Sequence, residues 1–576
     1  MVTEMLHETK GTFVVKGVWF APIDMLVTCD PTNIHSIMTA NFSKYVKGPE
    51  WRKRLAIFGQ HNVINTDFDE WKLHRNTYRA FLTHQKFQEL IVDIIPNIID
   101  KGVIPVLEHV SECGLVVDLQ ELLSRYTFDF ANMIAIGSNP NSLQIGFPES
   151  PFAKALDDAW EAIFVRHLVP ESFWKLLRWL RIGKESKLSG GWKVIDAFCE
   201  ESISTKKTMV AKEDGASFSL LNCYLNGQAV AGPAPAEKVM RDMITNTIIA
   251  TRDTCSTTLS WFFWLLSKNP SVEIKIREEL LTTTTTTDQV VMINLVDLSK
   301  LVYLHAAICE TMRLFPPAPY QSRTPIEPQT LPSGHNVNPN TNVLISAYAM
   351  ARMTSIWGDD CRKFKPERWI TENGKIKYEP PHKFFAFNTG PRICLGKDVA
   401  FMVMKAVTAT IINNYDVQVV ENHPVSPTLS IMFRMKHGLL AATSFSSLVR
   451  VPTRIRKRLL AECKTTSTGF KFDEVASTNR SSETGSSQEE KWSNSDGSTI
   501  PKSRKYCWEA SERWRESLEH QHILQEEEEH AIIKISEPGK LVPESSSNAD
   551  HERGEKSGDS NQSGSDGGKS IRGGNI

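Results

Sequence analysis

The residues with the clearest chemistry surround Cys394. They form the run Phe387-Asn388-Thr389-Gly390-Pro391-Arg392-Ile393-Cys394-Leu395-Gly396. Gly390 permits a sharp turn and Gly396 permits a close backbone approach to a flat cofactor, because neither residue has a Cβ atom. A helical apolar pattern runs from Leu395 to Asn413, so the N–H groups and dipole at the start of that helix stabilise a nearby thiolate. The pattern predicts that Cys394 binds a metal as a thiolate; a buried structural cysteine is the alternative.

The run resembles F-x-x-G-x-R-x-C-x-G, the haem-binding signature of the cytochrome P-450 monooxygenases. This resemblance implies haem b as the cofactor, with the iron held by the thiolate of Cys394. It also implies that Phe387, Gly390 and Gly396 shape the loop beneath the haem, and that Arg392 reaches a haem propionate through charge-assisted hydrogen bonds. An axial thiolate pushes electron density onto iron and favours cleavage of the O–O bond.

A second motif has the pattern E-x-x-R and consists of Glu310 and Arg313. On the helix predicted from about Leu301 to Phe315, these two residues share a face and can pair, and a Pro-Pro pair ends the helix. A later Pro-Glu-Arg-Trp run contains Arg368 and resembles the cytochrome P-450 segment whose arginine joins this pair. The resemblance predicts a buried salt-bridged triad of Glu310, Arg313 and Arg368 with a structural role. A solvated surface pair is the alternative.

A third motif lies inside a long helix predicted from about Glu237 to Lys268 and ended by an Asn-Pro pair. Its residues 250–255 resemble the cytochrome P-450 pattern A/G-G-x-D/E-T-T/S, where the helix bulges over the iron and makes room for dioxygen. An acid beside an alcohol suits proton delivery, so Asp253 and Thr254 are the predicted catalytic residues. Thr251 replaces the usual glycine and is expected to narrow the oxygen groove, because a β-branched side chain is stiff. The alternative for Thr254 is a hydrogen bond to its own helix backbone.

A fourth motif, W-x-x-x-R, consists of Trp71 and Arg75, which share one helix face at this spacing. The resemblance implies that both side chains reach a haem propionate; exposed surface residues are the alternative. The family group often has another propionate ligand, a histidine or arginine, just after the E-x-x-R helix. Ser322 stands where the histidine is expected and Arg323 follows it, so whether Arg323 replaces the histidine is open.

Composition sets bounds on the class of protein. The 576 residues carry a formal net charge of −1, so no charge excess indicates a nucleic-acid partner. The ten cysteines include no C-x-x-C pair, which argues against a disulfide or zinc framework and favours a reducing compartment.

The elements that hold these motifs are expected to form one large domain. The resemblance implies a mainly α fold with small β-sheets, a triangular helical prism around the haem, in a catalytic domain at residues 1–445. Residues 446–576 are expected to be a low-complexity, largely disordered tail, because 464–504 and 536–576 are rich in Ser, Gly, Glu, Lys and Asn.

Three further segments carry local predictions. Thr12 to Phe20 and Met25 to Thr28 are expected to form a strand pair with a turn near Pro22. In the resembled family this pair follows a membrane anchor and a first helix, so the chain is expected to be truncated at its start, and the sequence predicts no signal peptide. The tract Thr282 to Thr287 is expected to be a loop. Phe173 to Ile182 is amphipathic and could dip into a membrane surface; packing against the core is the alternative.

Several segments resemble the plant alkane and fatty-acid hydroxylases within this superfamily, especially mid-chain alkane hydroxylases of cuticular wax. They lie at residues 45–50, 173–176, 260–270, 353–358 and 433–438. The resemblance implies hydroxylation of a long-chain aliphatic substrate with O₂, and electrons from NADPH through NADPH-cytochrome reductase, with cytochrome b5 as a further donor. It implies a place at the cytosolic face of the endoplasmic reticulum membrane. The alternatives are a fatty-acid ω-hydroxylase, a truncated haem-binding relic without turnover, and a thiolate isomerase or dehydratase, against which the retained Asp253-Thr254 pair argues.

Overall fold

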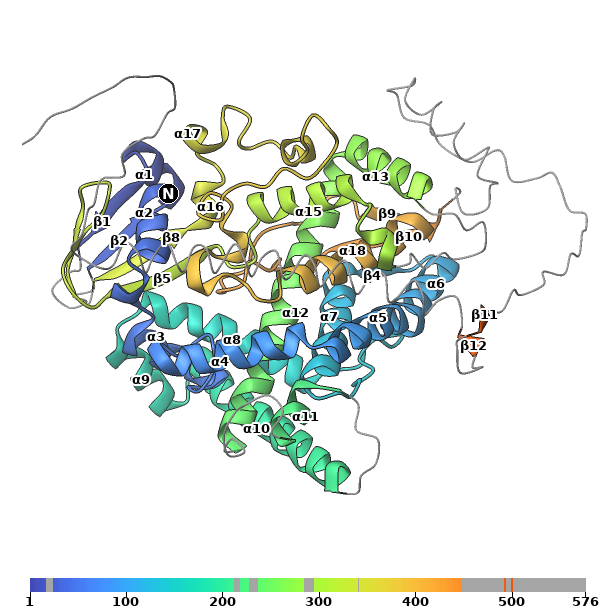
Figure 1. Cartoon of the computed structure of the whole chain (residues 1–576), viewed down its shortest axis with the longest axis horizontal. Coiled ribbons are helices and arrows are strands. Elements are labelled where there is room, and N and C mark those ends of the chain that lie inside the picture. Colours follow the sequence, from blue (N-terminus) through green and yellow to red (C-terminus); the bar gives the residue numbers. More distant parts are fainter. Residues whose placement is uncertain are drawn as a thin grey trace, which may run out of the picture. The chain divides into compact units, whose positions relative to one another are not determined.

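The computed structural model describes residues 1–16, 24–211, 218–226, 237–283, 295–339 and 341–446, and two short strands at 492–493 and 499–500. All of them belong to the first of two compact units, Met1–His522; the second unit, Ile523–Ile576, lies outside the described residues. Helices dominate the described residues and the strands form small sheets (Figure 1), which confirms the predicted fold class.

The elements keep one numbering from the N-terminus onward. The α-helices are α1 Val2–Glu8, α2 Pro31–His35, α3 Gly48–Arg54, α4 Phe68–Thr83, α5 Gln85–Ile98, α6 Ile104–Cys113, α7 Leu119–Ala135, α8 Pro151–Leu168, α9 Glu171–Leu180, α10 Gly183–Ala211, α11 Leu220–Leu225, α12 Glu237–Lys268, α13 Pro270–Thr283, α14 Leu295–Leu298, α15 Val302–Leu314, α16 Ala347–Met350, α17 Thr354–Trp357 and α18 Lys397–Asn414. The strands are β1 Thr12–Val15, β2 Met25–Thr28, β3 Tyr45–Val46, β4 Val116–Asp118, β5 Tyr320–Pro325, β6 Gln329–Thr330, β7 Asn336–Val337, β8 Asn342–Ser346, β9 Tyr415–Val419, β10 Leu440–Phe445, β11 Trp492–Ser493 and β12 Thr499–Ile500.

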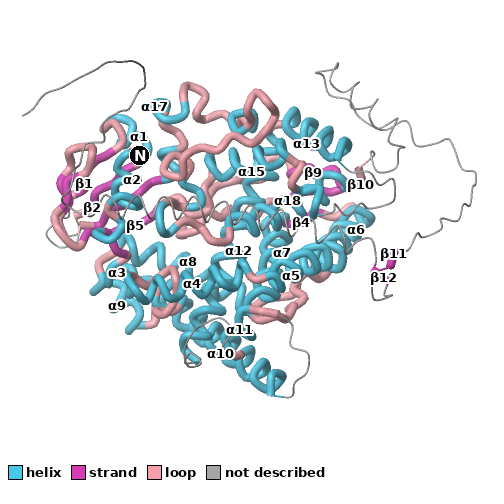
Figure 2. The backbone as a smooth tube through the Cα atoms, in the orientation of Figure 1, coloured by secondary structure: helices cyan, strands magenta, loops and turns pink. Residues whose placement is uncertain are grey.

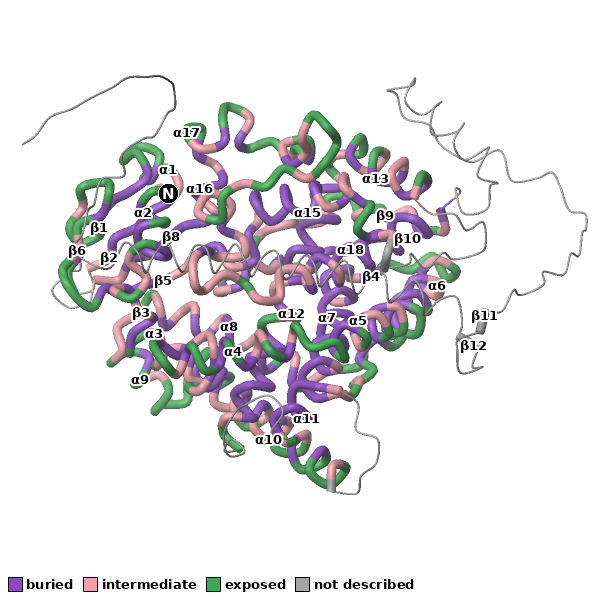
Figure 3. Tube along the Cα trace, viewed as in Figure 1, coloured by how far each residue is buried: buried purple, intermediate pink, exposed green. Residues whose placement is uncertain are grey.

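Helix α12 runs through the core beside α7 (Figure 2). Its observed bounds equal the predicted ones, because Pro270 lacks the N–H that would continue the helix. The helix predicted from about Leu301 to Phe315 is α15, one residue shorter at each end. Buried residues gather along α7 and α12 (Figure 3), since both helices are covered by neighbours on most of their surface.

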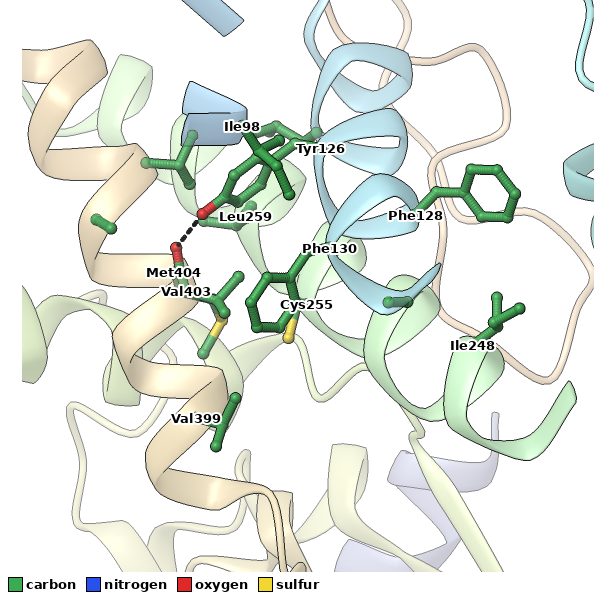
Figure 4. Close-up of a cluster of buried hydrophobic side chains, with 14 of the residues drawn as sticks. Ile98, Tyr126, Phe128, Phe130, Ile248, Cys255, Leu259, Val399, Val403 and Met404 are labelled. Carbon is green, nitrogen blue, oxygen red and sulfur yellow. Dashed lines mark hydrogen bonds between the residues drawn. The ribbon is translucent and has the colours of Figure 1, made fainter. Parts of the chain in front are cut away.

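The core also joins α7 to α18, the helix that follows Cys394. Tyr126 of α7 is fully buried, and its hydroxyl donates to the Val403 carbonyl of α18 (3.2 Å; Figure 4). Phe130 of α7 and Leu259 of α12 lie in the same apolar cluster. A buried hydroxyl that finds an acceptor on the neighbouring helix fixes the distance between the two helices without leaving an unpaired polar group. The start of α18 is therefore held against the core.

The largest sheet has five strands in the order β1-β2-β8-β5-β3. Strands β1 and β2 pair antiparallel, with Thr12 opposite Thr28, which confirms the predicted strand pair, although the predicted turn near Pro22 lies outside the described residues. Strand β8 runs parallel to β2 and antiparallel to β5. This places β5, the strand after α15, between the central strand β8 and the edge strand β3.

One local prediction was wrong in part. Helix α13 includes Thr282 and Thr283, which were expected in a loop; both hydroxyls donate to the Glu279 carbonyl (2.8 Å each), which compensates for their β-branched side chains. Residues 284–287 lie outside the described residues, as does nearly all of the predicted disordered tail. Within that tail β11 pairs antiparallel with β12, because Trp492 and Ile500 favour strands and an Asp-Gly pair lies between them. Among the described residues, no helix is long and apolar enough to cross a membrane.

Candidate functional site

Cys394 lies in a loop that is fixed by its own backbone. The Cys394 N–H donates to the Phe387 carbonyl (2.8 Å), and the Ile393 N–H donates to the Gly390 carbonyl (2.9 Å). The thiol itself is exposed. Surrounding protein raises its pKa through desolvation, while the Gly396 N–H and the charge of Arg75 oppose that rise. The start of α18 thus supplies the expected N–H group, but desolvation by the surrounding protein outweighs its effect on the pKa.

The space around the two loop glycines differs: protein atoms leave no room for a Cβ atom at Gly390 but leave room for one at Gly396. Gly390 has φ +63°, and a Cβ atom there would lie 2.1 Å from the Met38 carbonyl oxygen, so the loop must press directly on the backbone of the short helix η1, Ser36–Ala40. A Cβ atom at Gly396 would meet nothing within 4 Å. Protein packing therefore does not require glycine at position 396, whereas a flat ligand close to the backbone would.

Helix α4 places Trp71 and Arg75 beside this loop. Both residues are buried, at 5% and 6% exposure, so the alternative of exposed surface residues is wrong. Arg75 Nη1 donates to the carbonyl of Ile393, the residue before the cysteine (2.9 Å). The Trp71 ring centroid lies 4.9 Å from Cζ of Arg392, within the range of a cation–π contact. The structure thus brings Trp71, Arg75 and Arg392 together around one end of the loop.

Arg392 is held by protein acceptors. Its Nη2 donates to Asp67 Oδ1 (2.8 Å) and to the Thr66 carbonyl (2.7 Å), and its Nη1 donates to the Val63 carbonyl (3.3 Å). Burial lowers the pKa of Arg392 to about 10, and Asp67 opposes the shift. The sequence predicted a propionate as the partner of Arg392; the observed partners tie the loop to the segment before α4.

Two more buried cations, Lys47 and Arg323, lie near enough to Arg392 for its charge to lower their pKa values. Burial lowers the pKa of Arg323 to about 9, and the charge of Arg392 adds to that shift. Burial, Arg323 and Arg392 together lower the pKa of Lys47 well below its usual value. Asp67 is the negative group that acts on both. Three cations with one carboxylate leave a surplus of buried positive charge, which an anionic ligand would neutralise.

Arg323 has the donors that such a ligand needs. It is fully buried, and its Nη1 donates to the Ser322 carbonyl (2.7 Å), whereas Nε and Nη2 have no hydrogen-bond partner among the described residues. Buried guanidinium donors are costly to leave unpaired, so they indicate an acceptor supplied by a ligand. The hydroxyl of Ser322 instead bonds Asn342 Oδ1 of β8 (2.5 Å), since successive residues of a strand point to opposite faces. These residues fit the carboxylate end of a haem.

The E-x-x-R motif forms the core of a larger network. Glu310 is fully buried and receives two 2.7 Å hydrogen bonds from Arg313 and one of 2.8 Å from Trp369 Nε1. Arg368 lies 3.4 Å from Glu310 but 2.7 Å from Asp360. The structure brings the three predicted residues together, and the Arg368 side chain, which is 13% exposed, pairs with Asp360 as well as with Glu310. Hydrogen bonds from Arg368 and Lys365 lower the pKa of Asp360 to about 2.

Asp253 and Thr254 do not bond each other in the structure. The Thr254 hydroxyl donates to the Ala250 carbonyl one turn earlier (2.7 Å), which is the bond that the alternative described. Asp253 is fully buried, and its carboxylate receives hydrogen bonds from Trp160 of α8 (2.6 Å) and from Arg252 (2.7 Å). Helix α12 stays α-helical from residue 250 to 255. Thr251 stands in place of the family's glycine, the residue that would most readily let the helix bulge at this point.

Several of these partners were missed by sequence reasoning. They are Lys47, Asp67, Trp160 and Asp360, together with Asp157, which pairs with Arg252, and Arg434, which pairs with Asp157. Lys47 and Arg434 lie inside segments that carry the family resemblance, so only their roles were missed. Asp360 is eight residues from Arg368, but Asp67 and Asp157 stand far along the chain from Arg392 and Arg434, and no spacing in the sequence relates them.

Comparison with known proteins agrees with this geometry. A family model described as cytochrome P-450 matches residues 1–440. The chain belongs to the cytochrome P-450 family, and its class is that of haem-thiolate monooxygenases, with haem b bound through a cysteine thiolate and electrons supplied by a reductase.

The relatives are plant proteins. The chain is 41% identical over 444 residues to alkane hydroxylase MAH1 of Arabidopsis thaliana, which covers 76% of this chain and 87% of that protein. It is 40% identical over 447 residues to noroxomaritidine synthase 2 of Narcissus aff. pseudonarcissus MK-2014 (76% and 86%). It is 37% identical over 450 residues to cytochrome P-450 86B1 of Arabidopsis thaliana (76% and 80%).

Proposed function

We propose that residues 1–445 form a catalytic domain that hydroxylates a long-chain aliphatic substrate, an alkane or a fatty acid, with O₂ and NADPH-derived electrons. NADPH-cytochrome reductase would supply the electrons, with cytochrome b5 as a further donor. The observation that carries the proposal is the 41% identity to an alkane hydroxylase across the whole matched region. The synthase relative at 40% identity is named for a different product, so the substrate is the point that experiment must decide.

Within this proposal the Cys394 thiolate would hold the haem iron, and Phe387, Gly390 and Gly396 shape its loop. Trp71, Arg75 and Arg392 hold the propionate end, and the unpaired donors of Arg323 support its addition to that group in place of a histidine at position 322. When bound, haem b supplies the activation of dioxygen. Glu310, Arg313 and Arg368 hold the scaffold.

Thr254 and Asp253 are proposed to move protons on the oxygen side. The Thr254 hydroxyl donates its hydrogen to the Ala250 carbonyl. The lone pairs of its oxygen therefore remain available to accept a hydrogen bond from a proton donor. Burial raises the pKa of Asp253, and Arg252 only partly opposes the rise. A carboxyl that takes up a proton readily suits a group that must donate one near neutral pH.

The test is product formation by the purified full-length chain with NADPH and NADPH-cytochrome reductase. We expect hydroxylated product from a long n-alkane or a long-chain fatty acid, identified by mass spectrometry. Oxidation at an inner carbon of the alkane supports a mid-chain alkane hydroxylase, and oxidation at the terminal carbon of the fatty acid supports an ω-hydroxylase. No product from either substrate class, with haem bound and a thiolate-type ferrous–CO band present, would overturn the proposal and favour a relic without turnover.

We also propose that α9 lies on the cytosolic face of the endoplasmic reticulum membrane. Trp174 of α9 is buried beneath Arg166, whose Cζ lies 4.4 Å from the ring centroid. Trp179 is 77% exposed, and Phe173 and Leu176 are each 48% exposed. An exposed apolar strip flanked by basic side chains suits the boundary of an anionic lipid layer.

We expect Trp179→Glu to weaken binding to vesicles of mixed phosphatidylcholine and phosphatidylserine by about tenfold or more, because a large apolar side chain is replaced by a charge. Vesicle co-sedimentation measures the effect. Tyr378→Glu is the matched control, since Tyr378 is equally exposed at 79% but lies outside α9. Equal losses in both variants would contradict a specific role for α9.

A further inference from the structure

Three charged side chains from three segments meet beside Asp253. Arg252 of α12 is 2% exposed, and its Nη1 donates both to Asp253 Oδ1 (2.7 Å) and to Asp157 Oδ1 of α8 (2.9 Å). Arg434, from the segment between β9 and β10, donates to the same oxygen of Asp157. The charges therefore alternate along the chain Arg434, Asp157, Arg252, Asp253. Two cations and two carboxylates balance, which is the condition under which buried ions are tolerated.

The two acids of this network stand in different surroundings. The Asp157 side chain is 37% exposed, whereas that of Asp253 is 1% exposed. Burial on its own raises the pKa of Asp157, but Arg252 and Arg434 outweigh it and the pKa is lowered. The pKa of Asp253 is raised. A proton that enters the network is thus bound more readily by the inner carboxylate than by the outer one, which stays ionised.

An ionised Asp157 has a consequence for Arg252. When Asp253 carries a proton, Arg252 loses the charge of one partner, and Asp157 remains to balance it. Without Asp157 the guanidinium would be left with Asp253 alone, and a buried cation with one carboxylate holds that carboxylate ionised. Glu121 of α7 also acts on Arg252, but it is engaged by Arg125 (2.7 Å) and cannot take the place of Asp157.

We propose that Asp157, fixed by Arg434, is a positioning residue that shares the charge of Arg252 and thereby leaves Asp253 able to take up and release a proton. The proton that Asp253 gives toward Thr254 is replaced from water, so the carboxyl returns to its starting state and no other bond changes. Trp160, three residues after Asp157, donates to the second oxygen of Asp253 (2.6 Å). Helix α8 therefore sets both the orientation and the ionisation of the acid. The inference rests on the proposed role of Asp253.

The test compares Asp157→Asn with Asp158→Asn in the haem-loaded full-length chain. Asp158 is the next residue of α8 and pairs only loosely with Lys187 (3.6 Å), which makes it a matched control. We expect Asp157→Asn to lower kcat by about tenfold with KM unchanged, to divert NADPH electrons to hydrogen peroxide, and to shift the pH profile of kcat to lower pH. Asp158→Asn should change none of these. The ferrous–CO band and the thermal unfolding midpoint report whether each variant is folded.

Two further variants keep the outcomes distinct. Asp157→Glu restores the charge and should recover most of the coupling between NADPH consumption and product, whereas Asp253→Asn should lower it further than Asp157→Asn does. If Asp253→Asn impairs coupling but Asp157→Asn behaves like the control, the inference is overturned and the proposed role of Asp253 survives. If Asp253→Asn also behaves like the control, the inference about Asp157 and the proposed role of Asp253 are both wrong. A misfolded Asp157→Asn together with a fully coupled Arg434→Gln would likewise overturn the inference, because Arg434 is what fixes Asp157.

Discussion

Replacing Cys394 by alanine is expected to abolish the thiolate-type ferrous–CO band and to reduce product formation to background. The reason is that the loop around Cys394 offers the iron one sulfur and otherwise backbone groups that are bonded to each other. The same change should leave the unfolding free energy of the haem-free protein within about 0.5 kcal/mol of the wild type, because the thiol is exposed and packs against little. Absorption spectroscopy of the reduced, CO-treated protein measures the first effect, and urea unfolding followed by circular dichroism measures the second.

Cys255→Ala is the matched control for that experiment. Cys255 lies on α12, near enough for the charge of Cys394 to act on it, and its buried thiol has a pKa raised to about 12, chiefly by desolvation. Such a thiol does not ionise near neutral pH and should not bind iron. The variant should keep the ferrous–CO band and lose about 1 kcal/mol of stability from the vacated volume. A band that survives in Cys394→Ala but disappears in Cys255→Ala would show that Cys255, and not Cys394, is the iron ligand.

Sequence reasoning predicted those features that depend on neighbouring residues. The bounds of α12 follow from its apolar pattern and from the Asn269-Pro270 stop, and the spacing of Trp71 and Arg75 is enough to place them on one helix face. The pairing of β1 with β2 is also local. Each of these predictions uses contacts within one element or between adjacent ones, where the periodicity of the chain decides which side chains meet.

The electrostatic environment of the site could not be predicted in the same way. The haem-binding motif predicts that Arg392 reaches a propionate, but nothing in the sequence indicates its bond to Asp67, which is 325 residues away along the chain. The network that fixes Asp253 depends on Asp157 and Arg434, 277 residues apart. Ion pairs of this kind depend on how separate elements pack. If one helix were rotated by a single residue, other side chains would face the neighbouring element and each charged group would meet a different partner. The family motifs therefore predict which residues matter and leave open what each of them touches.

Glu310→Ala is expected to destabilise the protein by about 3–5 kcal/mol, because Arg313 would remain buried without its partner. Arg313 is 3% exposed, and its remaining acceptors are backbone carbonyls, which do not neutralise its charge. Denaturant unfolding measures the loss. Glu367→Ala is the control. Glu367 lies next to Arg368 but is 41% exposed, and its pair with Lys275 is a surface pair. The unfolding free energy should therefore fall by less than about 1 kcal/mol in this variant.

Glu310→Gln divides the predicted loss between charge and hydrogen bonding. Glutamine keeps one carbonyl oxygen for Trp369 Nε1 or for Arg313, but it removes the negative charge and places an NH₂ group against the Arg313 donors. If charge dominates, Glu310→Gln should be nearly as unstable as Glu310→Ala and should release haem on warming at a similar temperature. If the hydrogen bond from Trp369 dominates, Glu310→Gln should keep most of the stability. Equal midpoints for Glu310→Ala and Glu367→Ala would contradict both accounts, since a fully buried carboxylate with five bonded donors would then contribute no more than a surface one.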